Sequence, residues 1–292
     1  MFKLTDRKII NYLCNKYNIR MKHGLGQNFL CEEWVLEKIC NAAESDGETV
    51  LEIGPGFGVL TSALATKAKK VVSVEIDTAL LPVLSETLAG FDNIEIINAD
   101  FMKCSLRDLE ERLGNRYNVA ANLPYYITTP ILTKLLEEGR GIGNIVVMLQ
   151  KEVADRICAK EGGKDYGAVS VFVQYYCVPE IVCHVPASSF TPPPKVDSCV
   201  LKLRVLDEPA VSVDNEKNFF RLVKAAFAQR RKILSNALAN SGAFGNKENV
   251  VKALAEAGLE PNIRGEALSL KKFAELSNIF SKNHCISEKF GV

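Results

Sequence analysis

Five short apolar runs alternate with helical patterns in the middle of the chain. The runs are rich in β-branched residues, which is typical of strands buried on both faces of a parallel sheet; they span residues 49–53, 71–76, 94–98, 119–121 and 145–149. Amphipathic patterns lie between them, at about residues 59–69, 78–88, 106–113 and 131–138. This alternation predicts an α/β fold built on a doubly wound sheet.

The pattern changes in the last third of the chain. Two further strand candidates, residues 181–185 and 198–205, are joined by a Pro-rich segment that cannot be helical. The alternation ends near Asp207, and the patterns after residue 215 are helical only. We therefore expect an N-terminal extension at residues 1–20, an α/β domain at 21–206 and a small all-helical domain at 207–292.

Composition argues against several classes of protein. No apolar stretch approaches the ~20 residues of a membrane span, and the first residues lack the apolar core of a secretory signal. The 9 Cys are scattered without a C-x-x-C motif, and the 3 His lie far apart. Neither a zinc site nor a disulfide framework is expected. We expect a cytoplasmic, monomeric protein with reduced thiols and no metal.

Basic residues gather near the start of the predicted helical domain, although the net charge of the chain is only +1. The sequence predicts a helix from Lys217 to Leu234 with a basic face beside an apolar one. Such a face either binds phosphates or is merely solvated. The candidates for contacts to nucleic-acid phosphates are Arg221, Lys224, Arg230, Arg231 and Lys232.

A Gly-rich turn, Glu52-Ile53-Gly54-Pro55-Gly56, follows the first predicted strand. Glycines there let a ligand approach the backbone closely. Glu75 ends the second strand, where a carboxylate can accept hydrogen bonds from a ribose diol, and Asp100 follows the third, where it can accept from an adenine amino group. Val59 stands where a dinucleotide motif has its last Gly, so the pattern favours S-adenosylmethionine. For either carboxylate alone, helix capping is an equally good interpretation.

The tetrapeptide Asn122-Leu123-Pro124-Tyr125 follows the fourth predicted strand. An exocyclic amine on a nucleobase is a poor nucleophile, because its lone pair is delocalised into the ring. The side-chain oxygen of Asn122 and a nearby backbone carbonyl can accept both of its N–H bonds, while Pro124 has no N–H and helps to turn carbonyls inward. Tyr125 offers an aromatic face to the base. The motif indicates activation of a base amine, the alternative being a plain turn with a buried Tyr.

A loop at residues 24–30 precedes a helix expected to begin near Glu32. Asn28 in this loop can hydrogen-bond its own backbone and form a simple turn. The functional interpretation is that Gln27 and Asn28 hold the methionine end of the cofactor.

Together these motifs resemble the KsgA family of small-subunit ribosomal RNA adenine dimethyltransferases. The resemblance covers residues 22–278 and also rests on residues 148–153, 190–198, 226–232 and 264–269. It implies a Rossmann-like class I methyltransferase sheet with a helical C-terminal RNA-binding domain. By resemblance, the cofactor-binding residues are Gln27, Asn28, Leu30, Gly54, Gly56, Glu75, Ile76, Asp100, Phe101 and Asn122. Those at the target adenine are Asn122, Leu123, Pro124, Tyr125 and Phe190.

Members of this family transfer two methyl groups from S-adenosylmethionine to N6 of each of two adjacent adenosines near the 3′ end of 16S rRNA, in the small ribosomal subunit. Tyr125 and Phe190 are expected to flank the flipped adenine. Tyr126 stands where many relatives carry Asn, so the sequence assigns it no role.

Three alternatives stay open at this point. A large-subunit rRNA dimethyltransferase of the macrolide-resistance type is disfavoured by the Thr-Pro-Pro-Pro-Lys segment at residues 191–195. A non-catalytic RNA-binding or assembly factor is disfavoured by the intact Asn122–Tyr125 motif. A nicotinamide-dependent oxidoreductase is disfavoured by the glycine pattern.

Overall fold

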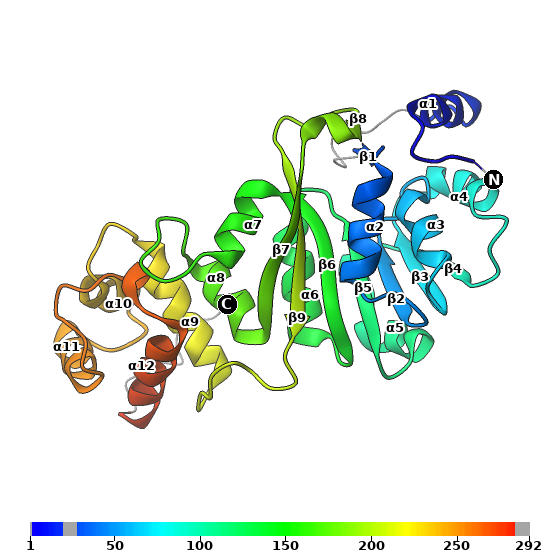
Figure 1. Ribbon diagram of the computed structural model, residues 1–292. Helices are drawn as coiled ribbons and strands as arrows, with labels where there is room; N and C mark the ends of the chain where they lie inside the picture. Colours follow the sequence, from blue (N-terminus) through cyan, green and yellow to red (C-terminus); the bar gives the residue numbers. More distant parts are fainter. Residues whose placement is uncertain (1, 20–27, 284–292) are drawn as a thin grey trace. The chain divides into compact units, whose positions relative to one another are not determined.

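The computed structural model describes residues 2–19 and 28–283 (Figure 1). By its internal contacts the chain divides into two compact units. The first is built from the residues up to 154 and from 179–205, and the second from 155–178 and from 206 onward. Residues 155–178, which the sequence analysis places with the sheet, therefore belong with the C-terminal helices.

A seven-stranded sheet forms the first unit, in the order β4-β3-β2-β5-β6-β9-β7. The first five strands are parallel, and β9 runs antiparallel to β6. The strands are β2 (Thr49–Ile53), β3 (Lys70–Glu75), β4 (Ile94–Asn98), β5 (Tyr117–Asn122), β6 (Ile142–Gln150), β7 (Cys177–Val185) and β9 (Ser198–Val205). The predicted doubly wound sheet is confirmed. Its strand order reverses between β2 and β5, the position at which such sheets bind ligands.

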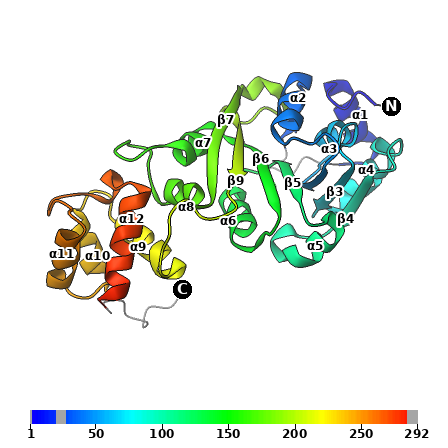
Figure 2. The same ribbon diagram turned by 60° about the horizontal axis from the view of Figure 1, so that its bottom comes forward.

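Helices cover both faces of this sheet (Figures 1 and 2). Right-handed crossovers place α3 and α4 on one face, where α2 packs on α3, and α5 and α6 on the other. Their bounds are α2 (Glu33–Ala42), α3 (Val59–Ala65), α4 (Leu81–Thr87), α5 (Leu106–Leu113) and α6 (Thr128–Glu138), while α7 (Lys151–Cys158) follows β6. The single-turn helices η2 (Thr78–Leu80), η3 (Phe101–Lys103) and η4 (Ala187–Ser189) lie in the connections.

The N-terminal segment forms a helix that the sequence analysis did not assign, α1 (Arg7–Lys16). Asp6 caps it by accepting from the backbone N–H of Lys8 at 2.8 Å, and Ile10 and Leu13 are fully buried in the core. At its other end, Lys16 Nζ lies 2.6 Å from a carboxylate oxygen of Glu86. The helix is thus an integral part of the first unit.

A separate two-stranded sheet joins segments far apart in sequence. In it, β1 (Phe29–Leu30) pairs antiparallel with β8 (Phe190–Thr191), Leu30 lying opposite Phe190. The Pro-rich segment that contains β8 is therefore held against the loop before α2.

The second unit is helical and has a core of its own. Its helices are α8 (Ala168–Tyr176), α9 (Glu216–Ala228), α10 (Leu234–Ser241), α11 (Lys247–Glu256) and α12 (Leu270–Lys282), with the turn η5 (Gly265–Ala267). Phe219, Phe244, Phe273 and Phe280 are fully buried between them, and each contributes about 1.5–3 kcal/mol through its burial. None of the helices in residues 2–19 and 28–283 is long and apolar enough to span a bilayer.

The prediction of one helix from Lys217 to Leu234 is wrong. α9 ends at Ala228, because Gln229 leaves the helical region with φ −131° and ψ 65°. The next helix starts at Leu234, whose N–H is bound to the Ile263 carbonyl at 2.7 Å. Arg231 consequently lies in a connection and not on the face of α9.

Candidate functional site

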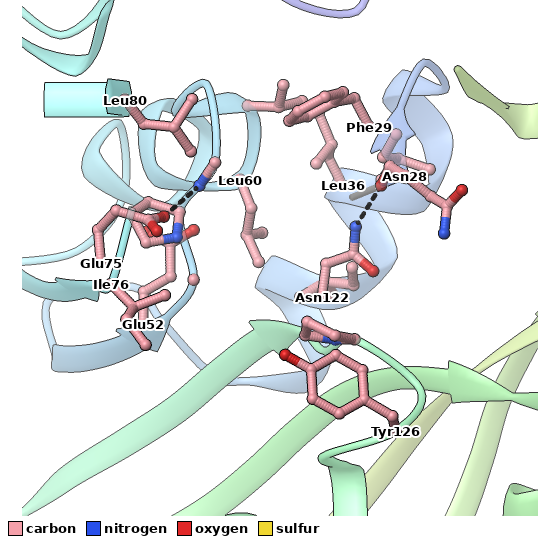
Figure 3. A pocket seen from close by; sticks show the side chains of 17 residues that line it. Asn28, Phe29, Leu36, Glu52, Leu60, Glu75, Ile76, Leu80, Asn122 and Tyr126 are labelled. Atoms are coloured by element: carbon pink, nitrogen blue, oxygen red, sulfur yellow. Dashed lines mark hydrogen bonds between the residues drawn. The ribbon is translucent and has the colours of Figure 1, made fainter. Parts of the chain in front are cut away.

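A cavity opens at the carboxyl ends of β2, β3 and β5, around the strand-order reversal (Figure 3). The cavity has a volume of about 120 Å³. Of the predicted site residues, it brings together Asn28, Leu30, Gly54, Gly56, Glu75, Ile76, Asn122 and Pro124. Gln27 lies outside the described residues.

The Gly-rich turn between β2 and α3 forms one wall. Gly56 has φ 61°, in the left-handed region that favours glycine. A Cβ built on Gly56 would also lie only 3.1 Å from the ring of Phe29, which is stacked on Phe57 with ring centroids 4.2 Å apart. A ligand can approach this backbone because no side chain stands on it.

Glu75 is held rigidly at the end of β3. Its two carboxylate oxygens accept from the backbone N–H groups of Asp77 at 2.7 Å and Gly56 at 3.2 Å. Burial raises the pKa of Glu75 above its ordinary value, although these two N–H groups act in the opposite direction. A carboxylate has about four lone-pair positions, so that further hydroxyl donors can still be accepted. Next to it, Ile76 exposes 54% of its surface and gives the cavity an apolar edge.

Glu52 is a second carboxyl group of the cavity, and the sequence analysis assigned it no role. Its side chain is buried, and Ser73 donates a hydrogen bond to it at 2.7 Å. Burial raises the pKa of Glu52 to about 7. Glu52 and Glu75 are the ionisable acidic side chains among the described lining residues, and a cationic ligand would stabilise their charged forms.

Asn122, the last residue of β5, has a fixed amide orientation. Its Nδ2 donates to the backbone carbonyl of Asn28 at 3.1 Å (Figure 3). Because that carbonyl can only accept, the Asn122 Oδ1 must be the atom that is turned away from it. The carbonyl of Pro124 accepts from the Ile127 N–H and from the Thr128 hydroxyl, both at 3.2 Å. The side-chain oxygen of Asn122 is therefore positioned to accept from a ligand.

The structure separates the aromatic residues around this motif. The hydroxyl groups of Tyr125 and Ser198 are hydrogen-bonded at 2.8 Å, and Tyr125 does not line the cavity. Phe190 is only 1% exposed and packs in the core, so its ring presents no open face in this conformation. Leu123 is likewise buried. Tyr126, in contrast, lines the cavity and is 61% exposed.

Asp100 and Phe101 lie at the end of β4 but do not line the cavity. Asp100 caps η3 by accepting from the Met102 N–H at 3.0 Å, and it lies 3.7 Å from Lys103 Nζ. Asp100 therefore acts as a helix cap, which was the alternative interpretation of this carboxylate. Phe101 is buried.

A family model described as ribosomal RNA adenine dimethylase matches residues 5–282, nearly the whole chain including α1. The chain belongs to this family. The predicted family, the predicted Rossmann-like methyltransferase fold and the predicted enzyme class, an rRNA adenine dimethyltransferase, are confirmed.

Relatives with the name ribosomal RNA small subunit methyltransferase A match over nearly their full length. The protein of Clostridioides difficile (strain 630) is 45% identical over 96% of this chain and 98% of its own. That of Geobacillus thermodenitrificans (strain NG80-2) is 49% identical over 90% of this chain and 92% of its own.

Two crystal structures of other proteins share the fold. A dimethyladenosine transferase from Plasmodium falciparum has a TM-score of 0.75 and 27% identity, covering 88% of this chain and 98% of its own. The 23S rRNA methyltransferase ErmE has a TM-score of 0.67 and 28% identity, covering 87% of this chain and 100% of its own.

The basic residues predicted to bind RNA differ in their surroundings within the second unit. Lys224, Arg231 and Lys232 are exposed. Arg230 donates to the carbonyl of Tyr166 at 3.2 Å and to that of Lys164, and it lies 3.6 Å from a Glu266 oxygen. The guanidinium of Arg221 is partly buried.

Proposed function

We propose that this family member transfers methyl groups from S-adenosylmethionine to N6 of two adjacent adenosines near the 3′ end of small-subunit rRNA. Relatives that are 44–49% identical carry the name small subunit methyltransferase A. The identity to the 23S methyltransferase is 28%, so a large-subunit substrate is the less favoured alternative.

The lining of the cavity fits S-adenosylmethionine, whose sulfonium and ammonium groups are both cationic. A bound cation would favour the charged forms of Glu52 and Glu75, which burial disfavours in the empty cavity. Gly56 leaves its backbone open to the ligand, and Ile76 and Leu80 offer apolar contacts to an adenine ring. When bound, S-adenosylmethionine supplies an electrophilic methyl group.

The placement of Asn122 is the observation that carries the proposal. Its Oδ1 accepts one N–H of the target amine, and we assign the second acceptor to the carbonyl of Leu123, since that of Pro124 is already engaged. Both bonds draw the amine towards tetrahedral geometry and aim its lone pair at the methyl group. Transfer is then an in-line displacement that needs positioning more than a strong base.

The other predicted roles stay parts of the proposal. Asp100 and Phe101 would hold the adenine of the cofactor, and Tyr125 and Phe190 would flank the target base. For Phe190 this requires that its ring first be uncovered, because it is 1% exposed. Glu75 would bind the ribose diol of the cofactor.

RNA binding is assigned to the helical unit and catalysis to the unit that contains the seven-stranded sheet. Lys224, Arg231 and Lys232 are the better candidates for phosphate contacts, because their side chains are exposed. Arg230 is engaged within its own unit, and its loss would act on RNA binding through the fold. The chemistry needs neither metal, membrane nor a second subunit, and a ribosomal substrate implies the cytoplasm.

The decisive experiment is methyl transfer from isotope-labelled S-adenosylmethionine to unmethylated small subunits, large subunits and naked rRNA. We expect N6,N6-dimethyladenosine in the small-subunit rRNA. Label in the large subunit would identify the resistance-type activity, and cofactor binding without any transfer would favour an assembly factor.

Asn122→Ala tests the amine-positioning role. We expect loss of methyl transfer with nearly unchanged RNA binding, because the amine is no longer oriented. Asn11→Ala, at an exposed position of α1, is the matched control and should remain active. Substantial turnover by the Asn122 variant would contradict the role.

A further inference from the structure

Tyr126 is both exposed to solvent and part of the cavity wall. It is 61% exposed, and it nevertheless lines the cavity together with Asn122 and Pro124. Figure 3 shows its ring near Asn122. An exposed tyrosine ring leaves a large apolar area in water, which is unfavourable unless a partner covers it. The ring therefore lies at the mouth of the cavity with a face open to a ligand.

The turn after β5 explains why Tyr125 and Tyr126 differ in exposure, Tyr125 being partly buried and Tyr126 exposed. The Ile127 N–H donates to the Pro124 carbonyl at 3.2 Å, which closes a four-residue turn with Tyr125 and Tyr126 at its centre. The hydroxyl of Tyr125 is held by Ser198. Tyr126 has its ring at the cavity, and α6 starts two residues later and anchors the turn.

We propose that Tyr126 is a substrate-contacting residue of the methyl-transfer reaction: its ring stacks on a substrate adenine at the mouth of the cavity. The inference rests on the proposed function, since it takes rRNA adenosine as the substrate. A base that is removed from its stack needs a replacement aromatic surface. Tyr126 provides a further aromatic surface next to the side chain that orients the amine, in addition to those proposed for Tyr125 and Phe190, and it is open in this conformation whereas Phe190 is buried.

Replacing Tyr126 by Leu or by Phe separates an aromatic role from simple apolar bulk. Tyr126→Leu keeps an apolar side chain but removes the ring, and Tyr126→Phe keeps the ring. The matched control is Tyr12→Leu, which removes a 49% exposed tyrosine of α1. Because both tyrosines are exposed, the variants are expected to fold; thermal unfolding checks this.

The assay is steady-state methyl transfer to unmethylated small subunits, with a parallel measurement of S-adenosylmethionine binding. For Tyr126→Leu we expect kcat/KM to fall about 5- to 150-fold, the loss associated with one base–aromatic stack, mainly through KM. Tyr126→Phe and Tyr12→Leu should retain the wild-type value, and the dissociation constant of S-adenosylmethionine should not change.

Three results would overturn the inference. These are unchanged kcat/KM in Tyr126→Leu, an equal loss in Tyr126→Phe, and a weakening of cofactor binding that matches the loss of activity. A wild-type chain that fails to methylate small subunits would instead refute the proposed function, so the two failures are distinguishable.

Discussion

Glu52→Gln should stabilise the cofactor-free protein above neutral pH. The pKa of Glu52 is about 7 in the folded chain, against an ordinary value of 4.5, because burial disfavours its charged form. Between these two values the folded chain holds a proton that the unfolded chain has released, so stability falls as pH rises from about 4.5 to about 7. At any pH above both values, the difference between the two pKa values lowers the free energy of unfolding by about 3 kcal/mol. Gln cannot ionise and avoids this cost.

Urea unfolding of wild type and variant at several pH values tests the argument. The stability advantage of Glu52→Gln should be small near pH 4.5 and should reach about 3 kcal/mol at pH 8. Glu95→Gln is the control, because Lys70 and Arg112 lower the pKa of Glu95 below its ordinary value of 4.5. Its carboxylate therefore loses its stabilising contribution only below about pH 4.5, and the destabilisation in this variant should stay constant from pH 4.5 to pH 8. An advantage of Glu52→Gln that does not depend on pH would refute the reasoning.

The same substitution should weaken the binding of S-adenosylmethionine. A cation in the cavity favours the ionised form of Glu52, so binding drives off its proton and wild-type affinity should rise between pH 6 and 8. The amino group of the ligand titrates equally with both proteins, and the comparison of the two isolates Glu52. Equal pH dependence of the two dissociation constants would contradict a role of Glu52 in binding.

Two further predictions concern other parts of the chain. Gly56→Ala should weaken S-adenosylmethionine binding and lower stability by about 1–2 kcal/mol, because the φ of 61° at this position is left-handed and the new Cβ would crowd Phe29. Calorimetry measures the binding and thermal unfolding measures the stability. Unchanged binding would contradict the role of the turn. Joint replacement of Lys224, Arg231 and Lys232 by Ala should reduce the slope of log affinity for RNA against log salt by up to about 3, one for each lost phosphate contact. An unchanged slope would mean that these side chains are only solvated.

The sequence predicts the sheet and much of the cavity for the same reason. Parallel strands bring their carboxyl ends to one edge, so Gly54, Glu75 and Asn122, each placed at the end of a predicted strand, had to meet there. The residue types at these positions then indicate the chemistry. No knowledge of side-chain packing is needed for this inference.

Exposure, in contrast, depends on tertiary packing and could not be predicted from local patterns. Phe190 and Tyr126 are both aromatic residues two positions away from a proline, yet pairing with Leu30 buries the first and a turn exposes the second. The end of α9 is a similar case. The helical spacing of basic residues continues in the sequence as far as Arg231, but the helix ends at Ala228. The chain then leaves the helix axis, and the Leu234 N–H donates to the Ile263 carbonyl where the next helix begins.

The buried carboxyl of Glu52 connects the stability of the protein to its ligand. A chain selected for stability alone would gain by replacing it, since an unpaired buried charge is costly. Glu52 lines the cavity together with Glu75. A cation bound there compensates the negative charge that burial disfavours, so the residue that lowers stability can strengthen ligand binding. Stabilisation by S-adenosylmethionine should accordingly be larger in the wild type than in Glu52→Gln at pH 8, even though the variant is the more stable protein without ligand. A variant that is both more stable and equally stabilised by the cofactor would show that Glu52 is a feature of the core and not of the binding site.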